Sequence, residues 1–175
     1  MNIFEFDGKK PVIAKDVFIA PNASIIGDVV IEEGCSIWYG AVVRGDFAPI
    51  RIGKNTSIQD NCVLHVGRSG IFIGENNSIG HGAILHNCII GNKNNIGMNA
   101  VILDDAVIED ECMIAAGSVV TGRDRFPSRQ IIAGTPAQTK KELSGNALWL
   151  VQDSSKEYLE IIKKYPSFYR YNAAD

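Results

Sequence analysis

The chain has 175 residues, a hydrophobic content of 46% and a formal net charge of −3. This length fits one domain with a substantial core, and the charge leaves no broad basic face for nucleic acid or an anionic membrane surface. No apolar run approaches the roughly 18 to 20 residues of a membrane span, and the opening MNIFEFDGKK lacks the features of a signal peptide. We therefore expect a cytoplasmic protein with no nucleic-acid or membrane partner.

An aliphatic residue recurs every six positions through most of the chain. Gly, Asn and Asp lie between these anchors and favour turns. A period of six fits neither an amphipathic helix nor a half-buried strand, and it predicts a solenoid with three short strands and three corners in each coil of about 18 residues. The anchors would stack into ladders inside this prism. They are Ile13, Ile19, Ile25, Ile31, Ile37, Val43, Ile52, Ile58, Leu64, Ile73, Ile79, Leu85, Ile90, Ile96, Ile102, Ile108, Ile114 and Val120.

The four cysteines fit the same repeat. Cys35, Cys62 and Cys112 each follow an anchor by four residues, and Cys88 does so if Ile84 is taken as its local anchor. No pair has the CxxC spacing of a metal site, and the position suits small inward-facing side chains. We interpret the cysteines as core residues. Ala23, Ala41, Thr56, Ala83, Ala100 and Ala106 share the position.

Beyond the last anchor the period of six stops. Residues 1–135 are therefore predicted to form the β-helix domain, which makes the protein mainly β. Residues 136–175 have helix-like apolar spacing around Tyr158 to Ile162, ended by Pro166. One or two C-terminal α-helices are expected to pack along the prism, where they would cover apolar surface and a sheet edge.

Two breaks in the repeat decide where the histidines lie. The steps from Val43 to Ile52 and from Leu64 to Ile73 are nine residues long, so each of these coils should contain 21 residues.

Arg44, His65 and His86 lie 21 residues apart, each directly after an anchor, and should form one column. Neighbouring coils are about 4.8 Å apart, so His65 and His86 could share one metal ion. Asp60 and His81 also differ by 21 residues and should form a second column at another corner.

A rigid prism cannot bring His81 to the other two histidines, but a neighbouring subunit could supply it. The register therefore predicts a homotrimer with a metal site at each interface. The alternative is that these are surface or interface histidines with ordinary hydrogen bonds.

Three segments of the chain resemble the gamma-class carbonic anhydrases, a family within the hexapeptide-repeat, left-handed β-helix superfamily. They are VVRGDFAPIRIGKNTSIQDNCVLH, IGHGAILHNC and AGTPAQ. The left-handedness of the coil is implied by this resemblance alone, because the general rule for crossovers between parallel strands would predict a right-handed coil. The resemblance also implies that His65 and His86 of one subunit and His81 of the next bind Zn²⁺, or Fe²⁺ or Co²⁺, and that a metal-bound hydroxide converts carbon dioxide to bicarbonate.

The same resemblance suggests roles for four further residues. Gln59 would orient the hydroxide, and its place after an anchor beside the histidine column agrees with this; an ordinary corner amide is the alternative. Arg44 and Asp46, together with Asp60, resemble the cross-subunit ion pairs that shape the site, although purely structural salt bridges are equally compatible.

Several positions depart from the family pattern. Phe47 replaces a glutamate after the RGD sequence, and the loop of residues 66–70 contains no acid, as in a short-loop subgroup of the family. Ser57 replaces an asparagine. A tyrosine lines the site in some members, and the tail offers Tyr158, Tyr165, Tyr169 and Tyr171.

Three other functions remain open at this point. A hexapeptide-repeat acyltransferase would use one histidine as a general base and would bind coenzyme A. A thioesterase would use the same metal on another carbonyl. A metal-stabilised trimeric scaffold would bind the ion without catalysis, because fold alone does not define function.

Overall fold

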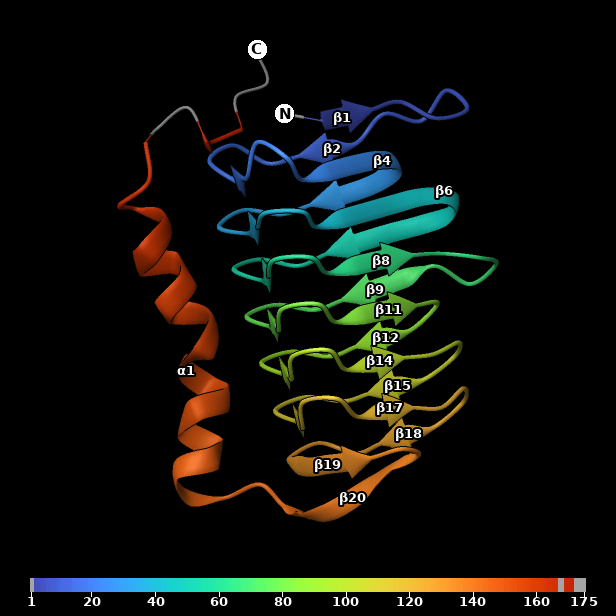
Figure 1. Cartoon of the computed structure of the whole chain (residues 1–175), viewed down its shortest axis with the longest axis vertical. Helices are drawn as coiled ribbons and strands as arrows, with labels where there is room; N and C mark the ends of the chain where they lie inside the picture. The colour runs from blue at the N-terminus through green and yellow to red at the C-terminus, as the bar shows by residue number, and fades with distance from the viewer. Residues whose placement is uncertain (1, 167–168, 172–175) are drawn as a thin grey trace.

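The computed structural model describes residues 2–166 and 169–171 (Figure 1). The backbone winds into a left-handed parallel β-solenoid of about seven coils with a single C-terminal helix. The predicted fold class is therefore confirmed. In the described part of the chain, no helix is both long and apolar enough to cross a membrane.

The strands form three faces of the prism. The first face contains β1 (Asn2–Phe4), β8 (Val63–His65), β11 (Ile84–His86), β14 (Val101–Ile102) and β17 (Val119–Val120). The second contains β2 (Val12–Ile13), β9 (Ile71–Ile73), β12 (Ile89–Ile90), β15 (Val107–Ile108) and β18 (Arg125–Phe126). The third contains β3 (Phe18–Ile19), β5 (Ser36–Ile37), β7 (Ser57–Ile58), β10 (Ser78–Ile79), β13 (Asn95–Ile96), β16 (Met113–Ile114) and β19 (Gln130–Gly134).

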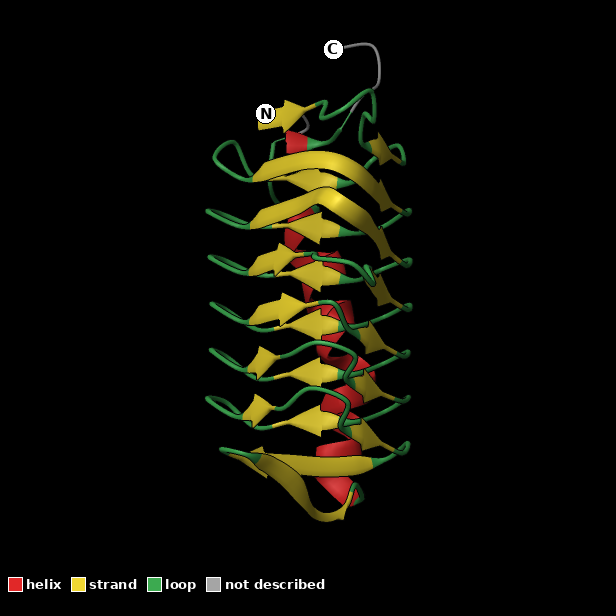
Figure 2. Cartoon of the chain, turned by 90° about the vertical axis from the view of Figure 1, so that its right-hand side faces the viewer, coloured by secondary structure: helices red, strands yellow, loops and turns green. Residues whose placement is uncertain are grey.

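Two long strands join the first face to the second. β4 (Ser24–Ile31) and β6 (Val42–Ile52) bend around the shared corner, as Figure 2 shows, so the two faces make one 12-stranded sheet. The third face is a separate sheet of eight strands, which ends where β20 (Ala137–Glu142) pairs antiparallel with β19. This last strand covers the open edge of the final coil, where an unpaired strand would otherwise invite association.

The coil lengths follow the breaks in the sequence repeat. Ser36 bonds to Ser57 across a coil of 21 residues, as predicted, and later coils return to 18 residues. Between them lies a coil of 17 residues, in which Asn94 bonds to Asn77. The anchors contain this deletion as a five-residue step from Leu85 to Ile90, which the choice of Ile84 as a local anchor concealed.

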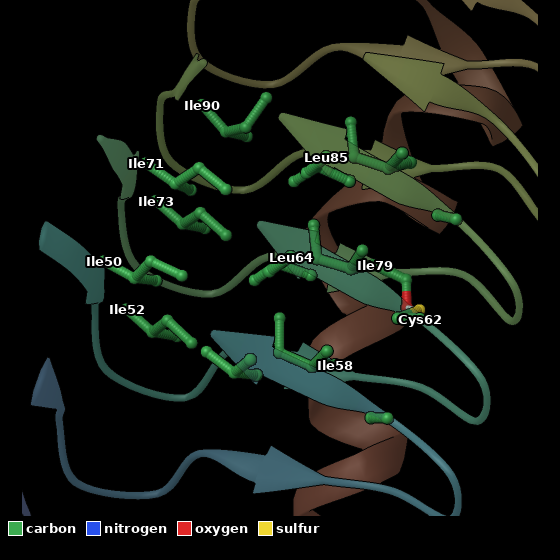
Figure 3. Packing of buried hydrophobic residues seen from close by; sticks show 14 of the residues in the cluster. Ile50, Ile52, Ile58, Cys62, Leu64, Ile71, Ile73, Ile79, Leu85 and Ile90 are labelled. Atoms are coloured by element: carbon green, nitrogen blue, oxygen red, sulfur yellow. Dashed lines mark hydrogen bonds between the residues drawn. The ribbon is translucent and has the colours of Figure 1, made fainter. Parts of the chain in front are cut away.

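The anchors fill the interior as predicted, and Figure 3 shows Leu85 above Leu64 in one ladder and Ile79 above Ile58 in another. One local assignment was wrong: Ile84 points outward with 43% of its surface exposed, and Leu85 is the inward residue. Parallel pairing of Leu85 with Leu64 fixes this alternation, since successive side chains in a strand face opposite sides.

All four cysteines are buried and free of disulfides, in agreement with a role in the core. Burial raises the pKa of the Cys35, Cys62 and Cys88 thiols to about 12. Cys88 keeps its interior place although its anchor differs from the expected one.

One helix, α1 (Gly145–Ile162), begins beside the last coil and runs back along the stack (Figure 1). Its Tyr158 packs against Trp38, with ring centroids 5.4 Å apart, near the first coils. After the helix, Tyr171 donates its backbone N–H to Val17 in the first coil at 2.8 Å. Residues 167–168 and 172–175 of the predicted helical tail lie outside the described residues.

Candidate metal centre

Two of the three histidines lie side by side on the first face. Parallel pairing aligns His65 on β8 with His86 on β11, and Arg44 on β6 precedes them in the same column. The imidazole centroids of the two histidines are 5.4 Å apart, and both side chains point outward because each follows a buried anchor. The predicted column is therefore present. We call Arg44, Asp46, His65 and His86 the two-histidine face.

Asp46 connects the charged residues of this face. Its Oδ1 lies 3.1 Å from His65 Nε2, and its Oδ2 accepts a hydrogen bond from Arg44 Nη1. Partial burial opposes ionisation of Asp46, but the hydrogen bond and positive charge of Arg44 outweigh it and lower the pKa of that carboxyl. Asp46 is thus an anion beside His65. Arg44 and Asp46 form this ion pair within one chain.

His81 lies at the corner that follows the third face. Its Nδ1 is 2.8 Å from Asp60 Oδ2, so the predicted second column is also present. Gln59 is buried and fixed, because its Nε2 donates to Ser78 Oγ at 2.9 Å and its Oε1 accepts the backbone N–H of His81. We call Gln59, Asp60 and His81, with the adjacent Tyr158 of α1, the His81 corner.

The position of Gln59 corrects one expectation. The sequence suggested that it lies beside the column of His65 and His86, whereas the structure places it against His81. The anchor before Gln59 belongs to the third face and those before the two histidines to the first, so the same place in the repeat appears on different sides of the prism.

A groove of about 270 Å³ runs between the His81 corner and α1. Its walls include the aromatic and apolar side chains of Trp149 and Met98, and the carboxylates of Asp153 and Glu157. Repeat-based reasoning missed these two acids, because the repeat ends before the helix begins.

Tyr158 is the tail tyrosine that lines this groove. Burial, then the charges of Asp60 and Glu157, raise the pKa of Tyr158 to about 12, so the phenol is a neutral hydrogen-bond donor. Tyr165 and Tyr169 pack instead on Phe18, with ring centroids 5.0 and 5.7 Å away.

His86 also has a carboxylate partner, which the sequence analysis did not identify. Asp104 Oδ1 lies 2.9 Å from His86 Nδ1. Leu85 pairs with Ile102 across the 17-residue coil, so Asp104 lies one position beyond the residue aligned with His86 and reaches it through its side chain.

The donor chemistry of these residues suits a metal ion, because neutral imidazole nitrogens are common ligands of zinc and other divalent metals. Each histidine touches one carboxylate, an arrangement that orients a metal-binding ring. Within the described part of a single chain, however, no three His, Cys, Asp or Glu side chains meet closely enough to hold one ion.

Known proteins show the same repeat and overall architecture. The family model described as "Bacterial transferase hexapeptide (six repeats)" matches residues 10–45 and 87–122. The structure is similar to that of a hexapeptide transferase family protein from Anaplasma phagocytophilum, with a TM-score of 0.92 and 38% identity over 94% of this chain and 98% of that one.

Two curated relatives indicate the group within this family to which the chain is similar in sequence. The chain is 40% identical to "Gamma carbonic anhydrase 2, mitochondrial" of Arabidopsis thaliana over 95% of its own length, but spans only 62% of that protein. It is 39% identical to "Carnitine operon protein CaiE" of Escherichia coli K12, over 93% of this chain and 83% of CaiE. The chain therefore belongs to the hexapeptide-repeat family, in the gamma-carbonic-anhydrase-like group that also contains CaiE.

Proposed function

We propose that this protein is a metal-dependent carbonic anhydrase that hydrates carbon dioxide to bicarbonate between the subunits of a homotrimer. His65 and His86 of one subunit and His81 of the next would hold the ion. The observation that carries this proposal is the arrangement of three histidines, each against a carboxylate, as two partial sites on different sides of one rigid prism. A threefold axis would join the two-histidine face of each subunit to the His81 corner of its neighbour.

Exposed apolar side chains near the histidines support an interface there. Phe47 is 74% exposed beside His65, and Ile84, on the same strand as His86, is 43% exposed. Apolar residues gathered on a surface commonly mark a site of protein association. Their burial would also exclude water from around the ion.

A zinc ion with three histidine ligands keeps an open position and lowers the pKa of a bound water to about 7. The protein side chains would supply orientation. Gln59 is held by Ser78 and by the backbone of His81, so its amide is fixed before substrate arrives. Asp46 and Asp60 would fix the rings of His65 and His81, and Arg44 would keep Asp46 ionised.

Hydration of carbon dioxide releases one proton, which the site must pass to solvent. Phe47 and the loop of residues 66–70 offer no acid for this purpose. Glu157 and Asp153 of α1 line the groove beside His81, and Glu157 is exposed to solvent. We assign proton acceptance to these two carboxylates, with Glu157 as the main route because it adjoins Tyr158.

Acyl transfer is the second candidate, because a structural relative is named as a hexapeptide transferase. An acyltransferase requires one general base, which does not account for three histidines that each contact a carboxylate. Thioester hydrolysis would use the same ion, and a scaffold would bind it without turnover. Metal content and coenzyme A binding distinguish acyl transfer from the others.

Stopped-flow measurement of carbon dioxide hydration tests the proposal. The protein is loaded separately with Zn²⁺ and, under anaerobic conditions, with Fe²⁺, and His81→Ala serves as the control. Activity that requires metal and disappears in the control is the expected result. A fully loaded trimer without activity would exclude the anhydrase and leave the thioesterase or the scaffold, while coenzyme A binding without metal would favour acyl transfer.

A further inference from the structure

Asp104 lies outside the set of residues to which the anhydrase proposal gives a role. It contacts His86 one coil further along the prism, with 2.9 Å between Oδ1 and the ring Nδ1. A carboxylate accepts a hydrogen bond only from a protonated nitrogen, so this contact places the proton of a neutral His86 on Nδ1. The unprotonated Nε2 is then the nitrogen available to a metal.

Asp104 is itself held by a buried amide. Asn87 Oδ1 accepts the backbone N–H of Gly67 at 2.7 Å, and Asn87 Nδ2 donates to Asp104 Oδ1. Because the Gly67 N–H requires an oxygen, the amide nitrogen must face Asp104. Asn87 is only 7% exposed, so this orientation is fixed.

Gly67 permits this arrangement because it has no side chain. A Cβ at that position would come within 2.9 Å of Asn87 Nδ2. The chain of contacts therefore runs from the loop after His65, through Asn87 and Asp104, to the ring of His86.

We infer that Asp104 is a positioning residue that sets the tautomer and ring orientation of His86, so that Nε2 faces the ion, and that Asn87 holds Asp104 for this task. The inference rests on the proposed function. The alternative is a simple surface ion pair, since the side chains of His86 and Asp104 are 33% and 54% exposed. Such pairs contribute little to stability, so substitution of Asp104 should leave the fold intact.

A matched pair of substitutions tests the inference on the whole chain. Asp104→Asn keeps an oxygen that can accept a hydrogen bond from the Nδ1–H of His86 but removes the negative charge. Asp104→Ala removes both the oxygen and the charge. Asp105→Asn is the control, because Asp105 bonds to Ser69 rather than to a histidine, and asparagine tolerates its left-handed φ of 62°. Zn²⁺ affinity is measured by competition with a chelator of known affinity, and urea unfolding of the metal-free proteins checks stability.

Asp104→Ala should raise the Kd for Zn²⁺ by about 10- to 100-fold, and Asp104→Asn by less, with metal-free unfolding unchanged. Asp105→Asn should match the parent. Unchanged affinity in both Asp104 variants, or an equal loss in Asp105→Asn, overturns the inference while the anhydrase proposal stands. A parent protein that binds no Zn²⁺, or whose binding survives His86→Ala, overturns both.

Discussion

Mixed trimers test whether two subunits build each site. His81→Ala damages only the corner that one subunit offers its neighbour, and His65→Ala damages only the two-histidine face. Either homotrimer should be inactive. In a random equal mixture, three quarters of the trimers contain both variants, and each of these restores one of its three interfaces, so about one quarter of the parent's activity should return.

The assay is stopped-flow carbon dioxide hydration after unfolding and joint refolding with Zn²⁺, with the mixed state verified by mass spectrometry of differently tagged subunits. A mixture of His65→Ala with His86→Ala is the matched control, because both lesions lie on the same face and no interface can be complete. Verified hybrids without recovery, or equal recovery in the control mixture, would refute a site shared between subunits.

Four further predictions concern the proton route, a surface charge cluster and the core. Glu157→Gln should lower kcat several-fold in dilute buffer and regain it in concentrated imidazole buffer; a loss that buffer does not restore would exclude proton acceptance. Asp28 is partly buried, yet the hydrogen bonds and charges of Arg51 and Lys9 lower its pKa. In urea unfolding at neutral pH, Asp28→Asn should therefore be less stable than the parent by up to about 1 kcal/mol, and this difference should disappear as the pH falls below the ordinary Asp value of about 3.9 and through the lowered pKa. Leu64→Ala should lower the free energy of unfolding by about 2 to 5 kcal/mol, because Leu64 is fully buried between coils; a change below about 1 kcal/mol would contradict that packing. Buried thiols such as Cys88, with a pKa of about 12, should resist iodoacetamide in the native protein and react in urea, and fast native alkylation would contradict their burial.

The repeat predicted most of the fold, because in a solenoid each coil has the same local environment. One aliphatic position in six was enough to identify the interior, and nine-residue steps identified the 21-residue coils. Where the repeat changed at a corner it failed: it missed the 17-residue coil and made Ile84 an inward residue. Both failures have one origin, because taking Ile84 instead of Leu85 as the anchor concealed the five-residue step to Ile90.

The same reasoning aligned Arg44, His65 and His86, since their spacing fixes their column. It did not connect Gln59 with His81, although the same register had placed Asp60, the next residue, in the column of His81. Asp104 and Glu157 were missed for different reasons. The first contacts His86 only through a particular side-chain conformation, and the second belongs to a helix whose docking no repeat describes.

A stack of coils has only nearest-neighbour contacts and can fray from either end. In this protein α1 connects the last coil to the first, where Tyr171 is bonded to Val17 and Arg170 donates to the carbonyl of Asp16. The helix and the residues after it thereby tie the two ends of the stack together, so that neither end is free to open alone. Loss of the terminal contacts should therefore let the end coils open before the middle coils that carry the histidines.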